Sequence, residues 1–178
     1  MNITLRSIAR LLVPASLALL AACQTLPGGG GRPGGKPETM LQVSSKGEPV
    51  AVFLANSSSQ PGWRPVQVQA STLYLNPQPV VTREDLVGVR AGTSSDGAGL
   101  LALVLNQVGQ RKVSTITAHN PNMRLALVVG RTMLAAPSYT SSVTSDQLVF
   151  SVGTEQNAVA AAGAIAGVDG ASGSMEAK

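Results

Sequence analysis

The first 22 residues of this 178-residue sequence limit what the remainder can fold into, because they have the pattern of a secretory signal. Arg6 and Arg10 give the N-terminus a positive charge, and an apolar run follows from Leu11 to Ala22. This order is typical of a signal peptide. The run is shorter than the roughly 20 apolar residues that a membrane-spanning helix needs. We therefore expect residues 1–22 to be removed and the rest of the chain to be exported.

The only cysteine, Cys23, comes directly after this run. Leu20-Ala21-Ala22-Cys23 resembles the bacterial lipobox, a Leu followed by two small residues and Cys. The resemblance implies cleavage between Ala22 and Cys23, a diacylglyceryl group on the Cys23 sulfur and a palmitate-like acyl chain on the new N-terminus. Two or three chains anchor a protein stably, whereas one binds only marginally. The alternative, in which Cys23 is an incidental small apolar residue, does not explain why it stands at the expected cleavage site.

Residues 23–39 are rich in Gly and Pro and are expected to form a tether between the lipid and the folded part. Gln24 follows the lipidated position. Enteric bacteria commonly use Asp there to keep a lipoprotein in the inner membrane, so Gln24 favours the outer membrane. The predicted location is thus the cell envelope, with the folded part facing the periplasm.

Composition limits the classes of partner. Without Arg6 and Arg10, 11 of the 13 basic residues remain against 9 acidic ones, and no basic cluster is interleaved with aromatics. We therefore expect no nucleic-acid binding. Aromatic residues make up only 3% of the chain, so Val, Leu, Ile and Ala must form most of the core.

Alternating and β-branched runs predict strands, and two segments predict helices. Residues 40–70 form a β-rich extension in which 40–44 and 50–55 are expected to pair as a hairpin. Residues 71–166 form the main domain, and residues 167–178 a flexible tail. The strands expected in or near the main domain cover 64–69, 73–75 (stopped by Asn76-Pro77), 87–92, 100–105, 125–129, 132–136 and 147–152.

Local signals place the helices and turns. Thr82 is expected to cap a single helical turn with Asp85 at its third position. Asn106 is expected to cap a helix over 107–118 whose apolar positions Val108, Val113 and Ile116 share a face. A tight turn at Gly130-Arg131 predicts a hairpin, and residues 155–165 an Ala-rich helix. Runs of strands broken by two helices indicate an α+β, ferredoxin-like fold: an antiparallel sheet with both helices on one face.

No catalytic constellation is apparent, so the chain is not expected to be an enzyme or to bind a cofactor or metal. His119 is the only histidine and stands at a helix end, where it suits the helix dipole. Glu84 and Asp85 are adjacent, which suits a helix start better than paired acid–base chemistry. Tyr74 is expected in the core, and Trp63 and Tyr139 are candidate surface anchors. The residues that bind a partner are not identified.

The ordered motifs resemble the first periplasmic head domain of SecD, a protein-export accessory subunit. The resemblance covers residues 73–165. It rests on Leu73-Tyr74-Leu75, Thr82-Arg83-Glu84-Asp85-Leu86, Leu103-Val104-Leu105, the helix positions Gly109, Lys112, Val113, Ile116 and Thr117, Arg124 to Gly130, and Ala135-Ala136-Pro137. Val129-Gly130-Arg131 lacks the family's Asp-Gly turn, and Val113 replaces a large aromatic. SecD's transmembrane helices have no counterpart here, so the resemblance implies no proton-driven motor.

Two functions of different classes follow. The first is a lipid-anchored binding domain that, by analogy with SecD, is expected to contact exported or envelope proteins, for example through an exposed strand edge. The second is a structural or adaptor subunit of a cell-envelope complex.

Overall fold

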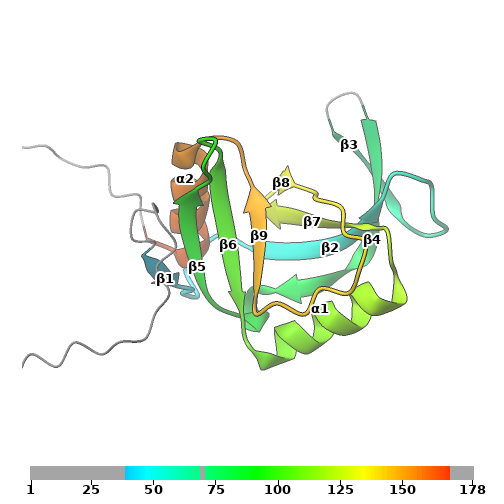
Figure 1. Ribbon diagram of the computed structural model, residues 1–178, viewed down its shortest axis with the longest axis horizontal. Helices are drawn as coiled ribbons and strands as arrows, with labels where there is room; N and C mark the ends of the chain where they lie inside the picture. The colour runs from blue at the N-terminus through cyan, green and yellow to red at the C-terminus, as the bar shows by residue number, and fades with distance from the viewer. Residues whose placement is uncertain (1–38, 69–70, 169–178) are drawn as a thin grey trace, which may run out of the picture. The chain divides into compact units, whose positions relative to one another are not determined.

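The computed structural model describes residues 39–68 and 71–168. The described part is an α+β fold of two antiparallel sheets, two α-helices and one 3-10 turn, which confirms the predicted class and is consistent with a ferredoxin-like domain. Its strands divide between two sheets, whose directions cross in Figure 1. The signal peptide, Ala22 and Cys23, the tether to residue 38 and the tail from residue 169 lie outside the described residues.

Sheet A has the strand order β1-β5-β6-β9, and every pairing in it is antiparallel. Its strands are β1 (Met40–Gln42), β5 (Leu86–Thr93), β6 (Gly99–Leu105) and β9 (Gln147–Ser151). The central strand β6 is buried at most positions, as its unbroken apolar sequence predicts.

Sheet B has the strand order β3-β4-β2-β7-β8 and is also antiparallel throughout. Its strands are β2 (Val50–Asn56), β3 (Arg64–Val68), β4 (Ser71–Thr82), β7 (Arg124–Val129) and β8 (Thr132–Ala135). The predicted hairpin at Gly130-Arg131 is confirmed, since Val129 pairs with Thr132 across it.

The predicted hairpin between 40–44 and 50–55 is wrong. β1 pairs with β5 in sheet A, whereas β2 pairs with β4 and β7 in sheet B. The connecting turn is held by the end of the second helix instead, because Ser44 N–H donates to Ala166 O (3.1 Å) and Glu48 N–H to Ala164 O (2.7 Å). The segment 40–70 is β-rich, and its strand β2 lies at the centre of sheet B rather than outside the main fold.

The expected stop at Asn76-Pro77 is also wrong, because β4 runs for 12 residues, from Ser71 through Asn76-Pro77 to Thr82. β3 pairs with β4 only up to Arg64↔Leu75. On its other side, β4 pairs with β2, and this pairing shifts register near Phe53. Beyond Leu75 one edge of β4 therefore has no strand partner among the described residues, and proline is tolerated where no N–H is needed for the ladder.

The first helix, α1 (Gln107–His119), begins as predicted. The Asn106 side chain accepts from the N–H groups of Val108 and Gly109, both at 2.9 Å. Its buried line is Gly109, Val113 and Thr117, and Val108 is 48% exposed, so Val108 does not share the buried face of Val113 as predicted. Gly109 explains the rotation: a Cβ there would lie 2.8 Å from Asp85 O, so only glycine allows this approach.

The second helix, α2 (Glu155–Ala166), packs on β5 and β6 of sheet A. Thr154 caps its start by accepting from Asn157 N–H (3.2 Å), and Gly167, in the left-handed region with φ 72°, ends it. Glycine suits this position because it has no Cβ to clash there. The buried face consists of small residues and one Ile: Ala158, Ala161, Ala162, Gly163, Ile165 and Ala166.

The main core joins both sheets and both helices and consists largely of Val, Leu, Ile and Ala, as composition predicts. Its fully buried members include Leu54, Leu101, Leu103, Leu127, Phe150 and Ile165. Strand alternation sends Ala55 and Ala126 to the opposite face of sheet B, where they form a smaller cluster with Leu73 and Leu75. In the described part of the chain, neither helix is long and apolar enough to cross a membrane.

Candidate binding surface

Four strands lie at sheet edges in the described part of the chain: β1 and β9 in sheet A, and β3 and β8 in sheet B. An edge strand can pair with another polypeptide unless charge, proline or shortness prevents it. β1 has three residues, and β3 contains Arg64 and Pro65. β8 and β9 contain neither a charged residue nor proline. These two edges are therefore the best candidates for contact with an extended chain.

The β7–β8 hairpin fixes which backbone groups of β8 are free. Gly130, with φ 60°, occupies the first position of its two-residue turn. Val129 and Thr132 flank such a turn as a hydrogen-bonded pair. Hydrogen-bonded and non-hydrogen-bonded pairs alternate along antiparallel strands, so the N–H and C=O of Met133 point away from β7. β8 thus offers an incoming strand a donor and an acceptor at Met133.

A groove of about 550 Å³ lies beside β8, between the β7–β8 hairpin and α2. Its lining residues are Glu48, Val129, Gly130, Arg131, Thr132, Leu134, Val152, Asn157, Ala160, Ala161 and Ala164. Three alanines form the α2 wall, and of these Ala160 is exposed. We call this the α2–β8 groove. Its small, mainly apolar wall leaves room for side chains from a strand added to β8.

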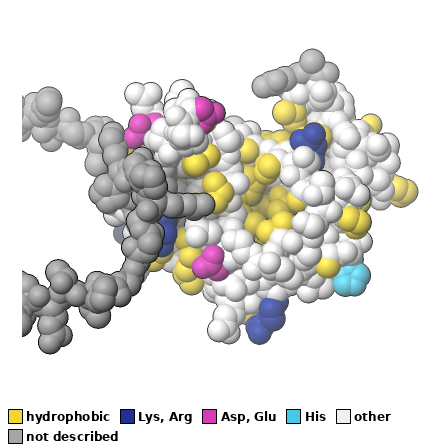
Figure 2. All heavy atoms as spheres, in the orientation of Figure 1, with side chains coloured by type: hydrophobic (Ala, Val, Ile, Leu, Met, Phe, Trp, Pro, Cys, Tyr) yellow, Lys and Arg dark blue, Asp and Glu magenta, His cyan; other side chains and the backbone are white. Residues whose placement is uncertain are grey.

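Figure 2 shows further hydrophobic side chains at the surface beside β9, over the part of sheet B that carries β7. Partly buried residues that pack on the main core include Leu134 of β8 and Val143 in the segment that leads to β9. Apolar surface thus adjoins the uncharged edges of both sheets.

The Arg83 side chain connects two segments that border the α2–β8 groove, the β1–β2 connection and the last turn of α2. Its guanidinium donates to Ser44 O (2.6 Å), to Ile165 O (2.8 Å) and to Glu48 O. These three carbonyls belong to the β1–β2 connection and to the last turn of α2. One side chain therefore fixes the end of α2 relative to β2, which begins at Val50. The residues near Arg83 in the sequence contain no pattern that predicts this role.

Asp85 is the other polar residue whose environment sequence reasoning missed: its turn was predicted, but its burial and its contact with Lys112 were not. Thr82 N–H donates to its carboxylate (3.0 Å), which confirms the predicted turn over η1 (Arg83–Asp85). Asp85 is only 2% exposed, and Lys112 of α1 donates to both carboxylate oxygens at 2.8 and 3.0 Å. Burial alone would raise the pKa of Asp85, but the hydrogen bonds from Lys112 and Thr82 outweigh it and hold the pKa below its ordinary value.

The remaining candidate residues do not come together as a catalytic or metal-binding site in the described part of the chain. His119 is exposed at the end of α1, with Nδ1 2.7 Å from Thr115 O. Tyr139 is half-buried and donates to Asn120 O (2.5 Å), and burial raises its pKa. Trp63 packs partly on the main core, whereas Tyr74, predicted in the core, is half-buried and belongs to neither core cluster. Within residues 39–68 and 71–168, no three His, Cys, Asp or Glu side chains gather as a metal site.

Comparison with known proteins identifies solved structures of similar fold. No family model and no curated protein matches the sequence. A crystal structure of SecDF in its super-membrane-facing form matches 67% of this chain at 18% identity, with a TM-score of 0.55. A second structure, of "a membrane component SecDF that enhances protein export", matches 69% at 20% identity, with a TM-score of 0.51.

The match spans 19% of the first SecDF chain and 62% of the second, so this chain corresponds to a part of each. At this level of identity the likeness establishes the fold and leaves function to be argued from the site. The SecD-like fold expected from the ordered motifs is confirmed.

Proposed function

We propose that this chain is a lipid-anchored periplasmic domain that binds exported or envelope polypeptides in an extended conformation. The observation that carries the proposal is the β8 edge, which is uncharged, lacks proline and runs beside a mainly apolar groove whose lining also includes Glu48 and Arg131. An extended segment can add to such an edge by main-chain hydrogen bonds, while alternate side chains enter the groove. The likeness to SecDF, a component described as enhancing protein export, supports the same class of partner.

The anchor in this proposal is Cys23, supported by the lipobox-like Leu20-Ala21-Ala22-Cys23 after an apolar run. Gln24 supports sorting to the outer membrane. Fifteen residues, 24–38, separate Cys23 from the described part. A flexible Gly-rich chain of that length has an r.m.s. end-to-end distance on the order of 20 Å, at about 5–6 Å × √n. Incorporation of a clickable fatty acid that Cys23→Ala abolishes would support the anchor, and incorporation unaffected by Cys23→Ala would contradict it.

Photocrosslinking in cells tests the binding surface. A photoreactive amino acid is placed in the full chain at Thr132 or Ala160, which are both exposed beside the α2–β8 groove. The matched control position is Ala118, exposed on α1. We expect crosslinks to many exported or envelope proteins from the two groove positions and few from Ala118. Equal yields from all three positions would contradict a specific surface.

The adaptor function remains the competing proposal, and the same experiment separates the two. A binding domain with many clients gives a ladder of crosslinked products, whereas an adaptor gives one discrete product of constant stoichiometry. Met133→Pro sharpens the test because it removes the N–H that points to the free edge and spares the Val129–Thr132 pair. We expect it to reduce the ladder about tenfold without loss of the folded protein.

A further inference from the structure

A second groove lies on another part of the molecule, between α1 and β4. It is lined by Pro79, Val80, Val108, Arg111, Lys112, Thr115 and Ile116 and encloses about 450 Å³. This volume is within the range of small-molecule sites, roughly 300–1,000 Å³. We call it the α1–β4 groove. Nothing in the proposed polypeptide binding uses it.

The groove combines an apolar floor with an incompletely covered helix face. Val80 is only 8% exposed and forms part of the main core, whereas Val108 is 48% exposed. Ile116 packs partly on the same core, two turns further along α1. From Val108 to Ile116 the helix rises about 12 Å. An apolar chain of similar length could therefore lie along the groove and cover Val108.

The charge beside this floor is positive. α1 contains Arg111, Lys112 and His119 and no acidic residue. The Lys112 ammonium is bound to the Asp85 carboxylate at 2.8 Å, so its charge is largely compensated. Arg111 makes no ion pair with any residue that the structure describes. Its guanidinium has the planar fork of donors that suits a carboxylate.

The backbone beside the groove cannot recruit an added strand. In the part of the chain that the structure describes, one edge of β4 has no strand partner beyond Leu75, but Pro77 and Pro79 lie in that stretch. Proline has no N–H to donate, and proline on an edge strand opposes pairing. A ligand in this groove must therefore be recognised by side chains: the apolar Val80, Val108 and Ile116, and Arg111, which lies between Val108 and Ile116 on α1.

We propose that the α1–β4 groove binds a long-chain carboxylate. The alkyl chain lies against Val80, Val108 and Ile116, and the carboxylate meets the Arg111 guanidinium. This combination distinguishes a fatty carboxylate from a neutral or cationic amphiphile of equal length. It also differs from the α2–β8 groove, where a free strand edge favours an extended polypeptide.

Photoaffinity labelling tests this proposal on the full chain in isolated membranes. The membranes are irradiated with a long-chain carboxylate that carries a diazirine on its alkyl chain, or with a trimethylammonium analogue of the same length. Labelled positions are mapped by mass spectrometry. We expect the carboxylate to label residues 76–82 and 107–119 about tenfold more than the analogue does, as is typical for a hydrogen bond to a charged group.

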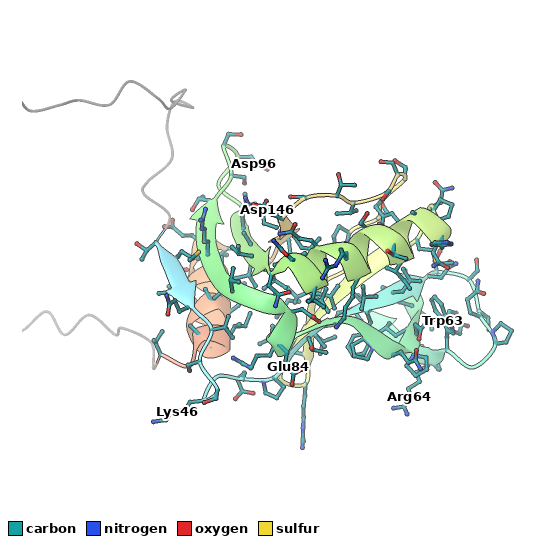
Figure 3. All side chains as sticks on the ribbon, turned by 90° about the horizontal axis from the view of Figure 1, so that it is seen from below. Lys46, Trp63, Arg64, Glu84, Asp96 and Asp146 are labelled. Atoms are coloured by element: carbon teal, nitrogen blue, oxygen red, sulfur yellow. The ribbon has the colours of Figure 1, made fainter. Side chains whose placement is uncertain are left out.

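Arg111→Gln should lower this labelling about tenfold, and Thr115→Glu, which places a negative charge in the groove, should lower it further. Arg64→Gln is the matched control because Arg64 is exposed on β3, which lies away from α1 in Figures 1 and 3. Circular dichroism would verify that each variant is folded.

Three results would overturn the proposal. Equal labelling by carboxylate and ammonium probes would show unselective hydrophobic partitioning. Labelling that Arg111→Gln leaves unchanged in a folded protein would remove the assigned contact. Crosslinks from the groove to an acidic protein segment, with no competition from added carboxylate, would show that a protein occupies it.

Discussion

The two helices are held in place by different means, and the grooves they border differ accordingly. α1 is fixed by polar side chains: the Asn106 cap, the Asp85–Lys112 ion pair and the contacts of Thr117. α2 is fixed at its C-terminal end by the Arg83 guanidinium, which donates to Ile165 O, and along the backbone by close packing, since glycines in the strand and loop that it meets let its ends approach. α1 carries Arg111 as a cation without an ion-pair partner among the described residues, whereas α2 presents alanines to its groove.

This difference indicates what each groove can recognise. The α1–β4 groove combines apolar side chains with an unpaired strand edge that contains two prolines, so it selects by charge and shape. The α2–β8 groove lies beside an edge with free backbone groups and a wall of small residues, so it accepts a range of side chains. The comparison predicts that adding a methyl group where the backbone approaches an end of α2 destabilises the protein. It also predicts that the stability contributed by the polar contacts of α1 depends on pH.

The largest expected effect is at the start of α2. Gly99 is buried, and a Cβ at this position would lie against the carbonyl of Thr154, the residue that caps α2. Because a backbone atom cannot move as a flexible side chain can, Gly99→Ala should lower the free energy of unfolding by about 3 kcal/mol, at the upper end of the usual overpacking cost. Urea denaturation followed by circular dichroism measures this change.

Gly163→Ala is the control, because it adds the same methyl group within α2. Its Cβ would meet Val168 O at 3.4 Å, an ordinary contact, and alanine favours a helix over glycine by roughly 1 kcal/mol. It should therefore leave the protein equally or slightly more stable. If both substitutions destabilised the protein equally, close approach at Gly99 would not be what positions α2.

Sequence reasoning succeeded where the signal is local. The Thr82–Asp85 turn, the Asn106 cap and the turn at Gly130 each depend on a few neighbouring residues, and all three are confirmed. The sequence did not predict that β1 and β2 join different sheets. This arrangement depends on Arg83 and on the end of α2, which are distant from β1 and β2 in the sequence. Hydrophobic periodicity placed Val108 on the same face as Val113 because it carries no information on the space at Gly109.

The grooves were less accessible to prediction than the fold. Exposed strand edges were expected, but which strands are edges follows from the sheet order, which the sequence does not state. The wall of the α2–β8 groove consists of alanines that look like ordinary helix formers. The ion pair that leaves Arg111 as the uncompensated cation joins residues 27 positions apart. Asp85 was interpreted only as a helix-start charge, since nothing local shows that Lys112 reaches it.

The intermediate effect tests the polar anchoring of α1. Asp85→Asn should lower the free energy of unfolding by about 2 kcal/mol at pH 7, because it removes a buried, charge-assisted contact with Lys112. The pKa of Asp85 is lowered in the folded state, so the carboxylate stabilises the fold above the unfolded-state pKa of about 3.9. This contribution is lost as the pH falls through the lower, folded-state pKa.

The difference in stability between the wild type and Asp85→Asn should thus narrow from about pH 4 downward. Denaturation over a pH series measures it. Glu84→Gln is the control because Glu84 is exposed beside Asp85, and it should change stability by less than about 0.5 kcal/mol. The cost of Gly99→Ala should not depend on pH, since no titrating group takes part. A constant difference for Asp85→Asn would argue against the ion pair as the anchor of α1.

The smallest expected effect concerns the far end of the buried line of α1. Thr117 Oγ1 donates to Val113 O (2.7 Å) and accepts from Val143 N–H (2.9 Å), so it ties α1 to the segment that leads into β9. Thr117→Val keeps the shape but leaves that N–H without its acceptor, at an expected cost of about 1 kcal/mol. Hydrogen exchange should show a faster-exchanging Val143 amide. Thr115→Val, at an exposed position of the same helix, should leave it unchanged. If the Val143 amide stayed equally protected in Thr117→Val, packing alone would hold this segment, and α1 would resemble α2 more closely than the contacts indicate.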